Sequence, residues 1–345
     1  FKQKTAYEIS LGLVGSEMCI RDREYASPKP VSGTISVIAA LHAFSRPREK
    51  VSILHFSNGG FPLNISGFDR IPVYLPFDEK IMNIDVEKAS EILQREKPKL
   101  VYLGASRFLF PHPVKEISEI VHDYGGVVVY DGSHVLGLIA GKQFQDPLSE
   151  GADVLIGSTH KTFPGPQGGV ILTNDNEKWE KIQETLSRPY MFVDNPHVAR
   201  IAALGITAYE MLKFGRDYAS QIVKNSKTLA SELAKLDIGV KAKNLGFTKS
   251  HQILLNLDTN GQELKSLLEK YNIFVDAVGR IGVQEVTRRG MRESEMIIIS
   301  KFIRDALNRL DANDIKVRIS AFVNNYRTAK YCYGCYENEL EKIPY

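Results

Sequence analysis

Short apolar runs alternate with amphipathic stretches along the chain from about residue 24 onward. Six runs are continuously apolar rather than alternating: VSILHF (51–56), IPVYLP (71–76), KLVYLGAS (99–106), VVVYD (127–131), DVLIGST (153–159) and GGVILTN (168–174). Such runs predict strands that are buried on both faces of a sheet. Residues 85–97, behind an Asp cap, and residues 114–124, behind Pro113, have helical spacing. The alternation predicts an α/β fold with a mostly parallel sheet covered by helices.

The second half of the chain has a different pattern. A long helical region covers about residues 198–236, followed by HQILLNL (251–257), a helix at 262–271, IFVDA (273–277) and a helix near 293–310. We therefore expect a large domain over residues 24–214 and a smaller C-terminal α/β lobe over 215–312. The tail at 313–345 is aromatic and charged and has no pattern that predicts an element.

Composition excludes several classes of protein. The 44 Lys and Arg residues against 41 Asp and Glu residues leave a net charge of +3, which is too small to indicate a nucleic-acid or membrane partner. No run approaches the roughly eighteen apolar residues of a membrane span. Three cysteines (Cys19, Cys332 and Cys335) are too few for a disulfide framework, so we expect a reducing cytoplasm.

The first 23 residues do not fit the rest of the chain. Residues 5–23 have a short apolar core without a basic flank or a small-residue cleavage site, which argues against a signal peptide. We expect residues 1–23 to be a non-native leader, and the natural N-terminal segment to be absent.

Lys161 stands in the segment STHKTFPGPQGG (158–169), which joins two predicted strands. The Pro residues behind the lysine restrict the backbone, and the small Gly residues fit a tight turn. A lysine that must reach one fixed point in a cleft needs such a turn, whereas a surface lysine does not. A solvated lysine in a hairpin loop is the alternative for this segment taken alone.

Two further segments suggest partners for a cofactor. Asp131 ends the most apolar strand, three residues before His134, and a buried carboxylate needs a cation such as a protonated pyridine nitrogen. The alternative is an aspartate that caps the next helix. PVSGT (30–34) precedes a helical run and offers N–H groups for a phosphate, although an ordinary helix cap has the same sequence.

The three segments offer a lysine that can form an imine, an acid that can pair with a pyridinium nitrogen, and N–H groups that can bind a phosphate. Together they indicate pyridoxal phosphate. Over about residues 25–310 the chain resembles the serine hydroxymethyltransferases, which are fold-type I pyridoxal-phosphate enzymes. The resemblance is carried by PVSGT, SNGGF (57–61), GASRFLFPHPVKEI (104–117), YDGSHVLGLIAGKQFQDPLSEGAD (130–153), STHKTFPGPQGG and RIGVQEVTRRGM (280–291).

The resemblance implies a role for each matching residue. Lys161, His134 and Asp131 would be the catalytic residues: Lys161 holds the cofactor as an imine, Asp131 pairs with the pyridine nitrogen, and His134 lies near the phenolic oxygen and the substrate. Arg280 would bind the substrate carboxylate in a bidentate manner. The cofactor-binding set would be Ser32, Gly33 and Thr34 at the phosphate, Phe61, Ser106 and Ser133 around the ring, and His160 beside the lysine, together with the catalytic residues.

The chain also departs from the family pattern. Phe61 stands where the family stacks a histidine on the cofactor ring, and a phenyl ring can stack but cannot exchange protons. Only FVDAVG (274–279) joins Ile273 to Arg280, where the family has a much longer loop that shapes the substrate and folate site. The Glu and Tyr residues that handle proton transfer in the family belong to the N-terminal segment that we expect to be missing from this sequence.

These observations leave three hypotheses. The first is a serine hydroxymethyltransferase-like enzyme that interconverts serine and glycine, with tetrahydrofolate as one-carbon acceptor. The short loop favours the second, a folate-independent aldolase or transaldolase of β-hydroxy amino acids. The third is a non-catalytic cofactor-binding paralogue. The resemblance also implies a homodimer. We expect no metal site, because Cys332 and Cys335 have zinc spacing but no second ligand pair.

Overall fold

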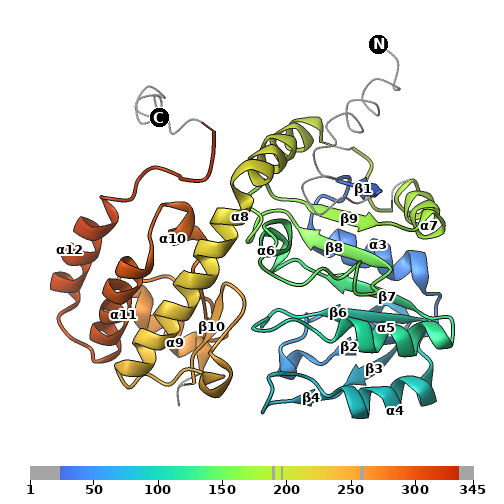
Figure 1. Cartoon of the computed structure of the whole chain (residues 1–345), viewed down its shortest axis with the longest axis horizontal. Helices are drawn as coiled ribbons and strands as arrows, with labels where there is room; N and C mark the ends of the chain where they lie inside the picture. The colour runs from blue at the N-terminus through green and yellow to red at the C-terminus, as the bar shows by residue number, and fades with distance from the viewer. Residues whose placement is uncertain (1–23, 189–190, 196, 257–259, 334–345) are drawn as a thin grey trace. The chain divides into compact units, whose positions relative to one another are not determined.

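The computed structural model describes residues 24–188, 191–195, 197–256 and 260–333. The expected leader at 1–23, including Cys19, and the tail from residue 334, including Cys335, lie outside the described residues. The chain divides into two compact units after Arg216, within the long helix α8 (Val198–Lys235). Figure 1 shows α8 and the elements of each unit.

Within the described part of the first unit, seven strands form one sheet in the order β1-β9-β8-β7-β6-β2-β3. The strands β2, β3, β6, β7 and β8 are parallel, whereas β9 is antiparallel to its neighbours β8 and β1. This arrangement confirms the predicted α/β fold with a mostly parallel sheet. The strands are β1 (Tyr25–Ser27), β2 (Lys50–Leu54), β3 (Ile71–Leu75), β6 (Leu100–Gly104), β7 (Val127–Asp131), β8 (Val154–Ser158) and β9 (Gly169–Thr173), and a separate hairpin pairs β4 (Phe77–Asp78) with β5 (Asn83–Ile84).

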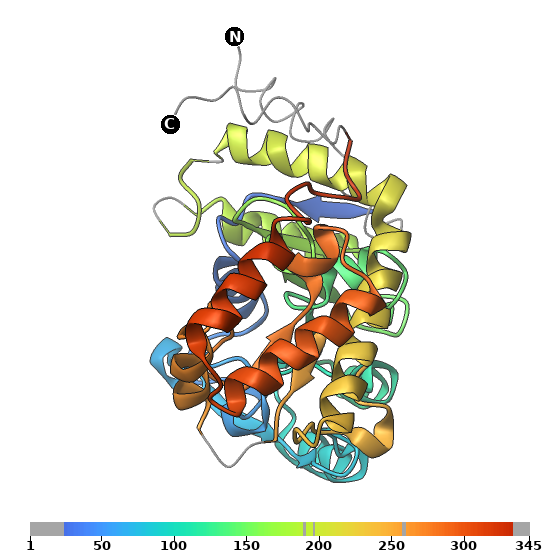
Figure 2. The same cartoon turned by 90° about the vertical axis from the view of Figure 1, so that its left-hand side faces the viewer.

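Helices cover the sheet, as Figures 1 and 2 show. The helix α3 packs on α7 and against β7, β8 and β9, while α4 and α5 pack on each other and against β3 and β7. The helices of this unit before α8 are α3 (Gly33–Phe44), α4 (Val86–Glu96), α5 (Val114–Asp123), the short α6 (Leu136–Ala140) and α7 (Asn176–Leu186).

Alternate strand residues explain why the predicted strands are continuously apolar. Tyr102, Val129 and Ile156 join one buried cluster with Val37 and Leu41 of α3. The intervening residues Leu103, Val128 and Leu155 are equally inaccessible to solvent. Both faces of these strands are therefore buried, as expected for a parallel sheet between helices.

Local signals position the helices where the sequence predicts them. The Oδ1 atom of Asp85 accepts a hydrogen bond from the backbone N–H of Lys88 and caps α4. The helix α5 begins after Pro113 and ends before Gly125, whose φ of +74° favours glycine.

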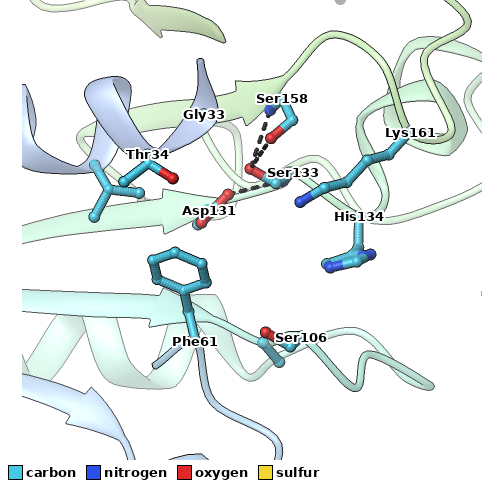
Figure 3. A pocket seen from close by; sticks show the side chains of 11 residues that line it. Gly33, Thr34, Phe61, Ser106, Asp131, Ser133, His134, Ser158 and Lys161 are labelled. Carbon is cyan, nitrogen blue, oxygen red and sulfur yellow. Dashed lines mark hydrogen bonds between the residues drawn. The ribbon is translucent and has the colours of Figure 1, made fainter. Parts of the chain in front are cut away.

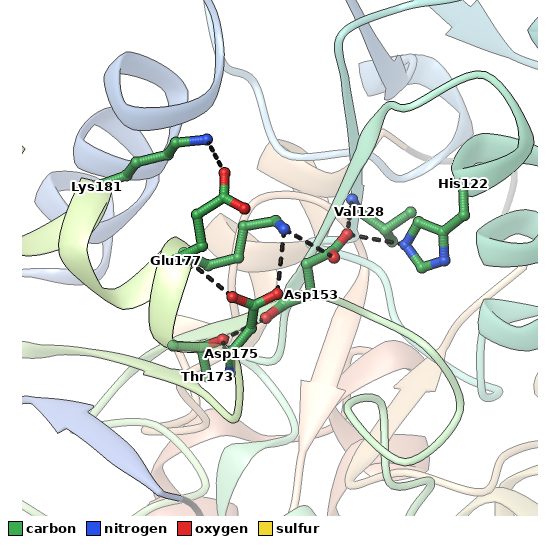
Figure 4. A network of polar contacts seen from close by, with 8 residues as sticks. His122, Val128, Asp153, Thr173, Asp175, Glu177 and Lys181 are labelled. Atoms are coloured by element: carbon green, nitrogen blue, oxygen red, sulfur yellow. Dashed lines mark hydrogen bonds and ion pairs between the residues drawn. The ribbon is translucent and has the colours of Figure 1, made fainter.

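A polar network joins β8 to α5 and α7 at the edge of the sheet where β7 and β8 begin, as Figure 4 shows. Asp153 Oδ2 accepts hydrogen bonds from Val128 N at 2.7 Å and pairs with His122 Nε2 at 3.0 Å. Lys178 Nζ lies 3.8 Å from Asp153 Oδ1 and 3.2 Å from Asp175 Oδ2. The network holds α5 and α7 to the sheet at the edge opposite the carboxyl ends of β7 and β8.

The second unit contains a small antiparallel pair and the remaining helices. The strand β10 (Gln252–Leu254) pairs with β11 (Arg280–Gly282). The helices are the C-terminal part of α8, then α9 (Gly261–Glu269), α10 (Gln284–Arg288), α11 (Glu293–Leu307) and α12 (Ala312–Val323). None of the helices among the described residues combines the length and the apolar character that a membrane crossing requires.

Two features of this unit have no clear signal in the sequence. The run IFVDA (273–277) is a loop, and the strand that pairs with β10 forms at Arg280–Gly282. The helix α12 lies in a region without a recognisable pattern, because Ile315 is its only fully buried residue among those described. Asp311 caps this helix by accepting hydrogen bonds from the backbone N–H groups of Asn313 and Asp314.

Candidate active site

The site forms where the parallel strands β6, β7 and β8 end. Because these strands run in the same direction, Gly104, Asp131 and Ser158 at their carboxyl ends reach one edge of the sheet. A cavity of about 290 Å³, including its open mouth, lies at this edge beside the N-terminus of α3. Figure 3 shows the cavity and its side chains. Its walls are Gly33, Thr34, Val37, Phe61, Ala105, Ser106, Asp131, Ser133, His134, Ser158 and Lys161.

Most of the residues that the sequence singles out meet in this cavity: Gly33, Thr34, Phe61, Ser106, Asp131, Ser133, His134 and Lys161. Ser32 does not line it, because its Oγ caps α3 by accepting a hydrogen bond from Ile35 N. His160 also lies outside the lining, next to Lys161 in sequence. Burial and the neighbouring charge of Lys161 lower the pKa of His160.

Arg280 belongs to the second unit, where it begins β11. Its Nε donates to Oδ2 of Asp276 at 2.6 Å, and its backbone N–H donates to Oδ1 of the same carboxylate at 3.2 Å. Asp276 Oδ1 also accepts a hydrogen bond from Val278 N. Asp276 therefore fixes both the turn before Arg280 and one edge of the guanidinium group.

Asp131 is 7% exposed and both of its carboxylate oxygens have donors. The backbone N–H of Ser133 donates to Oδ1 at 2.8 Å, and the hydroxyl of Tyr102 donates to Oδ2. These two donors meet the hydrogen-bonding requirement of a buried carboxylate. Sequence reasoning missed Tyr102, although a tyrosine within an otherwise aliphatic strand is a signal that could have found it.

Ser133 and Ser158 connect the ends of β7 and β8. Ser158 donates to Ser133 Oγ from its backbone N at 3.0 Å and from its Oγ at 3.1 Å. The start of α3 lies directly against this pair, since a Cβ atom on Gly33 would come within 2.1 Å of Ser158 Oγ. Ser158 was not predicted as a site residue, although it opens the segment that carries Lys161.

The loop that carries Lys161 is held by its own hydrogen bonds. Thr159 Oγ1 donates to the carbonyl of Pro166 at 2.7 Å, and Thr159 N donates to the carbonyl of Gly168 at 3.0 Å. Thr162 Oγ1 donates to the carbonyl of His134 at 2.8 Å and ties the loop to the segment after β7. The loop beside Lys161 is thereby tied to the backbone of His134.

The N-terminus of α3 provides a seat for an anion beside the cavity. The N–H groups of the first turn lack carbonyl partners within the helix, and the helix dipole places partial positive charge there. Ser32 Oγ takes the N–H of Ile35, while Gly33 and Thr34 line the cavity. Arg200, which sequence reasoning also missed, donates from Nη2 to the carbonyl of Pro28 at 2.7 Å and holds the chain that leads into α3.

The amine of Lys161, the carboxylate of Asp131 and the N-terminus of α3, which can bind an anion, thus surround one cavity. Within the described residues, no group of three or more His, Cys, Asp or Glu side chains could hold a metal ion. Lys161 can attack a carbonyl group as a nucleophile, and Asp131 can face a cationic ring nitrogen. Such an arrangement suits a small aromatic aldehyde that carries a phosphate.

Comparison with sequence models of protein families shows which family the chain belongs to. The sequence model described as serine hydroxymethyltransferase matches residues 21–303, which is most of the chain. The chain belongs to the serine hydroxymethyltransferase family. Relatives of this name include proteins from Methanocella arvoryzae, 43% identical over 92% of this chain and 80% of the relative, and from Sulfolobus acidocaldarius, 40% identical over 94% and 79%. The family resemblance expected from the sequence is confirmed.

A solved structure adds a second comparison. The L-threonine transaldolase from Pseudomonas fluorescens, solved in its internal aldimine state, matches this serine hydroxymethyltransferase-family chain with a TM-score of 0.91 at 28% sequence identity. The match covers 99% of this chain and 82% of the transaldolase. The fold is therefore that of a fold-type I pyridoxal-phosphate enzyme.

Proposed function

We propose that this protein is a serine hydroxymethyltransferase-like enzyme that uses pyridoxal phosphate to interconvert serine and glycine. Tetrahydrofolate is the proposed one-carbon acceptor, so that serine and tetrahydrofolate give glycine, methylenetetrahydrofolate and water. One observation carries the proposal: Lys161 and Asp131 line the same cavity, with the N-terminus of α3 beside them. The names of the relatives support the choice of reaction.

The donor set fits the proposed cofactor. The Lys161 amine would bind the aldehyde carbon, and the Asp131 carboxylate would pair with the pyridine nitrogen. The N–H groups at Gly33 and Thr34 would bind the phosphate. Phe61 lines the cavity and has an apolar face on which the ring can stack. When bound, pyridoxal phosphate supplies an electron-withdrawing ring that weakens the bonds at the α-carbon of an amino acid.

The remaining roles fall to titratable and cationic side chains. His134 lines the cavity with Lys161 and is the group proposed to hold or release a proton at an imidazole nitrogen. The guanidinium group of Arg280 is proposed to bind the substrate carboxylate, with Asp276 fixing its orientation through Nε. The substrate is accordingly a small amino acid.

Serine cleavage with and without tetrahydrofolate tests the proposal. Glycine formation from serine should be strongly stimulated by tetrahydrofolate, and Lys161→Ala should abolish it. Cleavage that is unaffected by folate would contradict the hydroxymethyltransferase assignment. Cofactor binding without any turnover of serine or threonine would instead identify a non-catalytic paralogue.

The second candidate function is a transaldolase or aldolase that cleaves β-hydroxy amino acids without folate. It is favoured by the match to the L-threonine transaldolase and by the short segment 274–279 before Arg280. Under this alternative, threonine would be cleaved to glycine and acetaldehyde at a rate that tetrahydrofolate does not change.

We further propose that the chain acts as a homodimer in the cytoplasm. The first half of α8 contacts the Lys161 loop through Leu204, which lies within contact distance of the Cβ position of Gly165. The outer face of the same helix exposes Val198, Ile206 and Leu212, with Ile206 65% exposed. A second copy of the chain would cover these side chains beside the site. Ile206→Glu should therefore give monomers in light scattering, and a monomeric wild-type protein would contradict the dimer.

A further inference from the structure

Tyr102 reaches the acidic end of the proposed cofactor site from within the sheet. Tyr102 and Gly104 project from the same face of β6, because side chains alternate along a strand. In the register of the sheet, Gly104 is paired with Asp131 and Tyr102 with Val129. The tyrosine ring therefore extends past Gly104 toward the next residue on that face of β7, which is Asp131.

Gly104 provides the space for this arrangement. A Cβ atom on Gly104 would lie 3.0 Å from ring atoms of Tyr102 and 2.7 Å from Cβ of Asp131. Any side chain at this position would push the phenol and the carboxylate apart. The ring itself is 3% exposed and packs in the cluster that contains Val37 and Leu41 of α3. Its position is thus fixed by packing on one side and by Gly104 on the other.

The hydroxyl of Tyr102 acts as a donor. Burial raises the pKa of Tyr102 well above its usual value, and the charge and hydrogen bond of Asp131 raise it further. The phenol is therefore protonated throughout the working range of an enzyme, and its O–H donates to Asp131 Oδ2. A carboxylate oxygen has two lone pairs, so Oδ2 can accept a second hydrogen bond from a ring nitrogen.

We propose that Tyr102 is a positioning residue that holds Asp131 Oδ2 in place and weakens its pull on the proton of the cofactor's pyridine nitrogen. This inference rests on the proposed pyridoxal-phosphate site. A hydrogen bond to the ionised form of a carboxylate stabilises that form. With the phenol in place, Oδ2 shares its electron density between two donors, and the proton between Oδ2 and the ring stays on the ring nitrogen. Without it, the carboxylate draws that proton toward itself and the ring withdraws electrons less strongly.

The test compares Tyr102→Phe with a matched control, Tyr130→Phe. Tyr130 is also fully buried and lies on the neighbouring strand β7, where its hydroxyl donates to Gln145 Oε1 at 2.9 Å. Each substitution removes one buried phenol hydroxyl and keeps the aromatic ring. Only Tyr102→Phe removes a donor from Asp131. The control therefore separates a general loss of stability from the loss of the hydrogen bond to Asp131.

The readout is the nitrogen NMR resonance of the pyridine ring. It is recorded on protein loaded with isotope-labelled pyridoxal phosphate. Wild type and Tyr130→Phe should show a protonated ring nitrogen. Tyr102→Phe should move the resonance toward that of an unprotonated ring.

Each other outcome has a distinct meaning. An unchanged resonance in Tyr102→Phe would overturn the role of Tyr102 while leaving the cofactor site intact. Failure of the wild-type protein to bind pyridoxal phosphate at all would overturn the proposed function together with this inference.

Discussion

Gly33 and Ser158 lie so close together that a single added carbon would make them collide. A Cβ atom on Gly33 would come within 2.1 Å of Ser158 Oγ and 3.2 Å of Ser158 Cβ. Gly33 opens the helix that offers the anion seat, and Ser158 ends the strand that leads to Lys161. The contact therefore couples the proposed phosphate site to the proposed imine site.

Gly33→Ala should lower the free energy of unfolding by about 1–3 kcal/mol through overpacking. It should also weaken pyridoxal-phosphate binding, because the new methyl group pushes the start of α3 away from Ser158. Equilibrium titration of the apoprotein with the cofactor measures the effect. The double variant Gly33→Ala with Ser158→Ala removes the atom nearest to the new methyl group and should recover most of the affinity. No recovery in the double variant would show that the contact with Ser158 is not the cause.

Asp153 provides a test of stability at the edge of the sheet away from the cavity. Asp153→Ala removes the acceptor of Val128 N and the partner of His122 and Lys178, and should lower the free energy of unfolding by about 2 kcal/mol. Asp153→Asn keeps an acceptor for Val128 N and should lose less. Urea denaturation measures both. Cofactor affinity should be unchanged in each variant, and a loss comparable to that of Gly33→Ala would contradict this separation.

His112 should make the protein sensitive to mild acid. Its ring is buried and stacks on Phe108 at 4.4 Å between centroids, and burial lowers the pKa of His112 to about 3. The unfolded chain takes up a proton below about pH 6.5, whereas the folded chain does not. The free energy of unfolding is therefore highest above that pH and falls as the pH decreases. His112 accounts for about 2 kcal/mol of this fall between pH 6.5 and 5.

The variant His112→Phe cannot titrate at this position. Its free energy of unfolding should fall less steeply than that of the wild type over the same pH interval, as measured by urea denaturation at several pH values. Parallel curves for the two proteins would show that His112 does not carry this part of the acid sensitivity.

Arg280 should affect the amino-acid substrate rather than the cofactor. Arg280→Lys keeps the positive charge but loses the planar pair of donors, so KM for serine should rise roughly tenfold or more with little change in cofactor affinity. Steady-state kinetics and cofactor titration separate the two effects. Asp276→Asn should also raise KM, by a smaller factor. Equal losses of serine and cofactor binding would count against a role in binding the substrate carboxylate.

The sequence predicts the sheet well because burial on both faces leaves a local signature. VVVYD coincides with β7, and the other apolar runs of the first unit each overlap one strand of the sheet. Most of the candidate site follows as well, since Asp131, His134 and Lys161 stand directly behind strand ends. The carboxyl ends of parallel strands meet, so residues in these places are brought together by topology.

The parts that were missed depend on register or on weak patterns. Tyr102 meets Asp131 across 29 positions, and only the pairing of Gly104 with Asp131 reveals that contact. Ser158 and Arg200 likewise act through contacts between distant segments. The helix α12 and the three-residue strand at Arg280–Gly282 bury too few apolar side chains to leave a periodic signal.

The most direct test of the account is to locate the lysine that carries the cofactor. The protein is incubated with pyridoxal phosphate, reduced with borohydride, digested, and mapped by mass spectrometry. We expect a pyridoxyl group on Lys161, together with a visible absorbance band before reduction that Lys161→Ala lacks. A label on another lysine, such as Lys29, whose pKa is lowered by burial, with Lys161 unmodified, would contradict it.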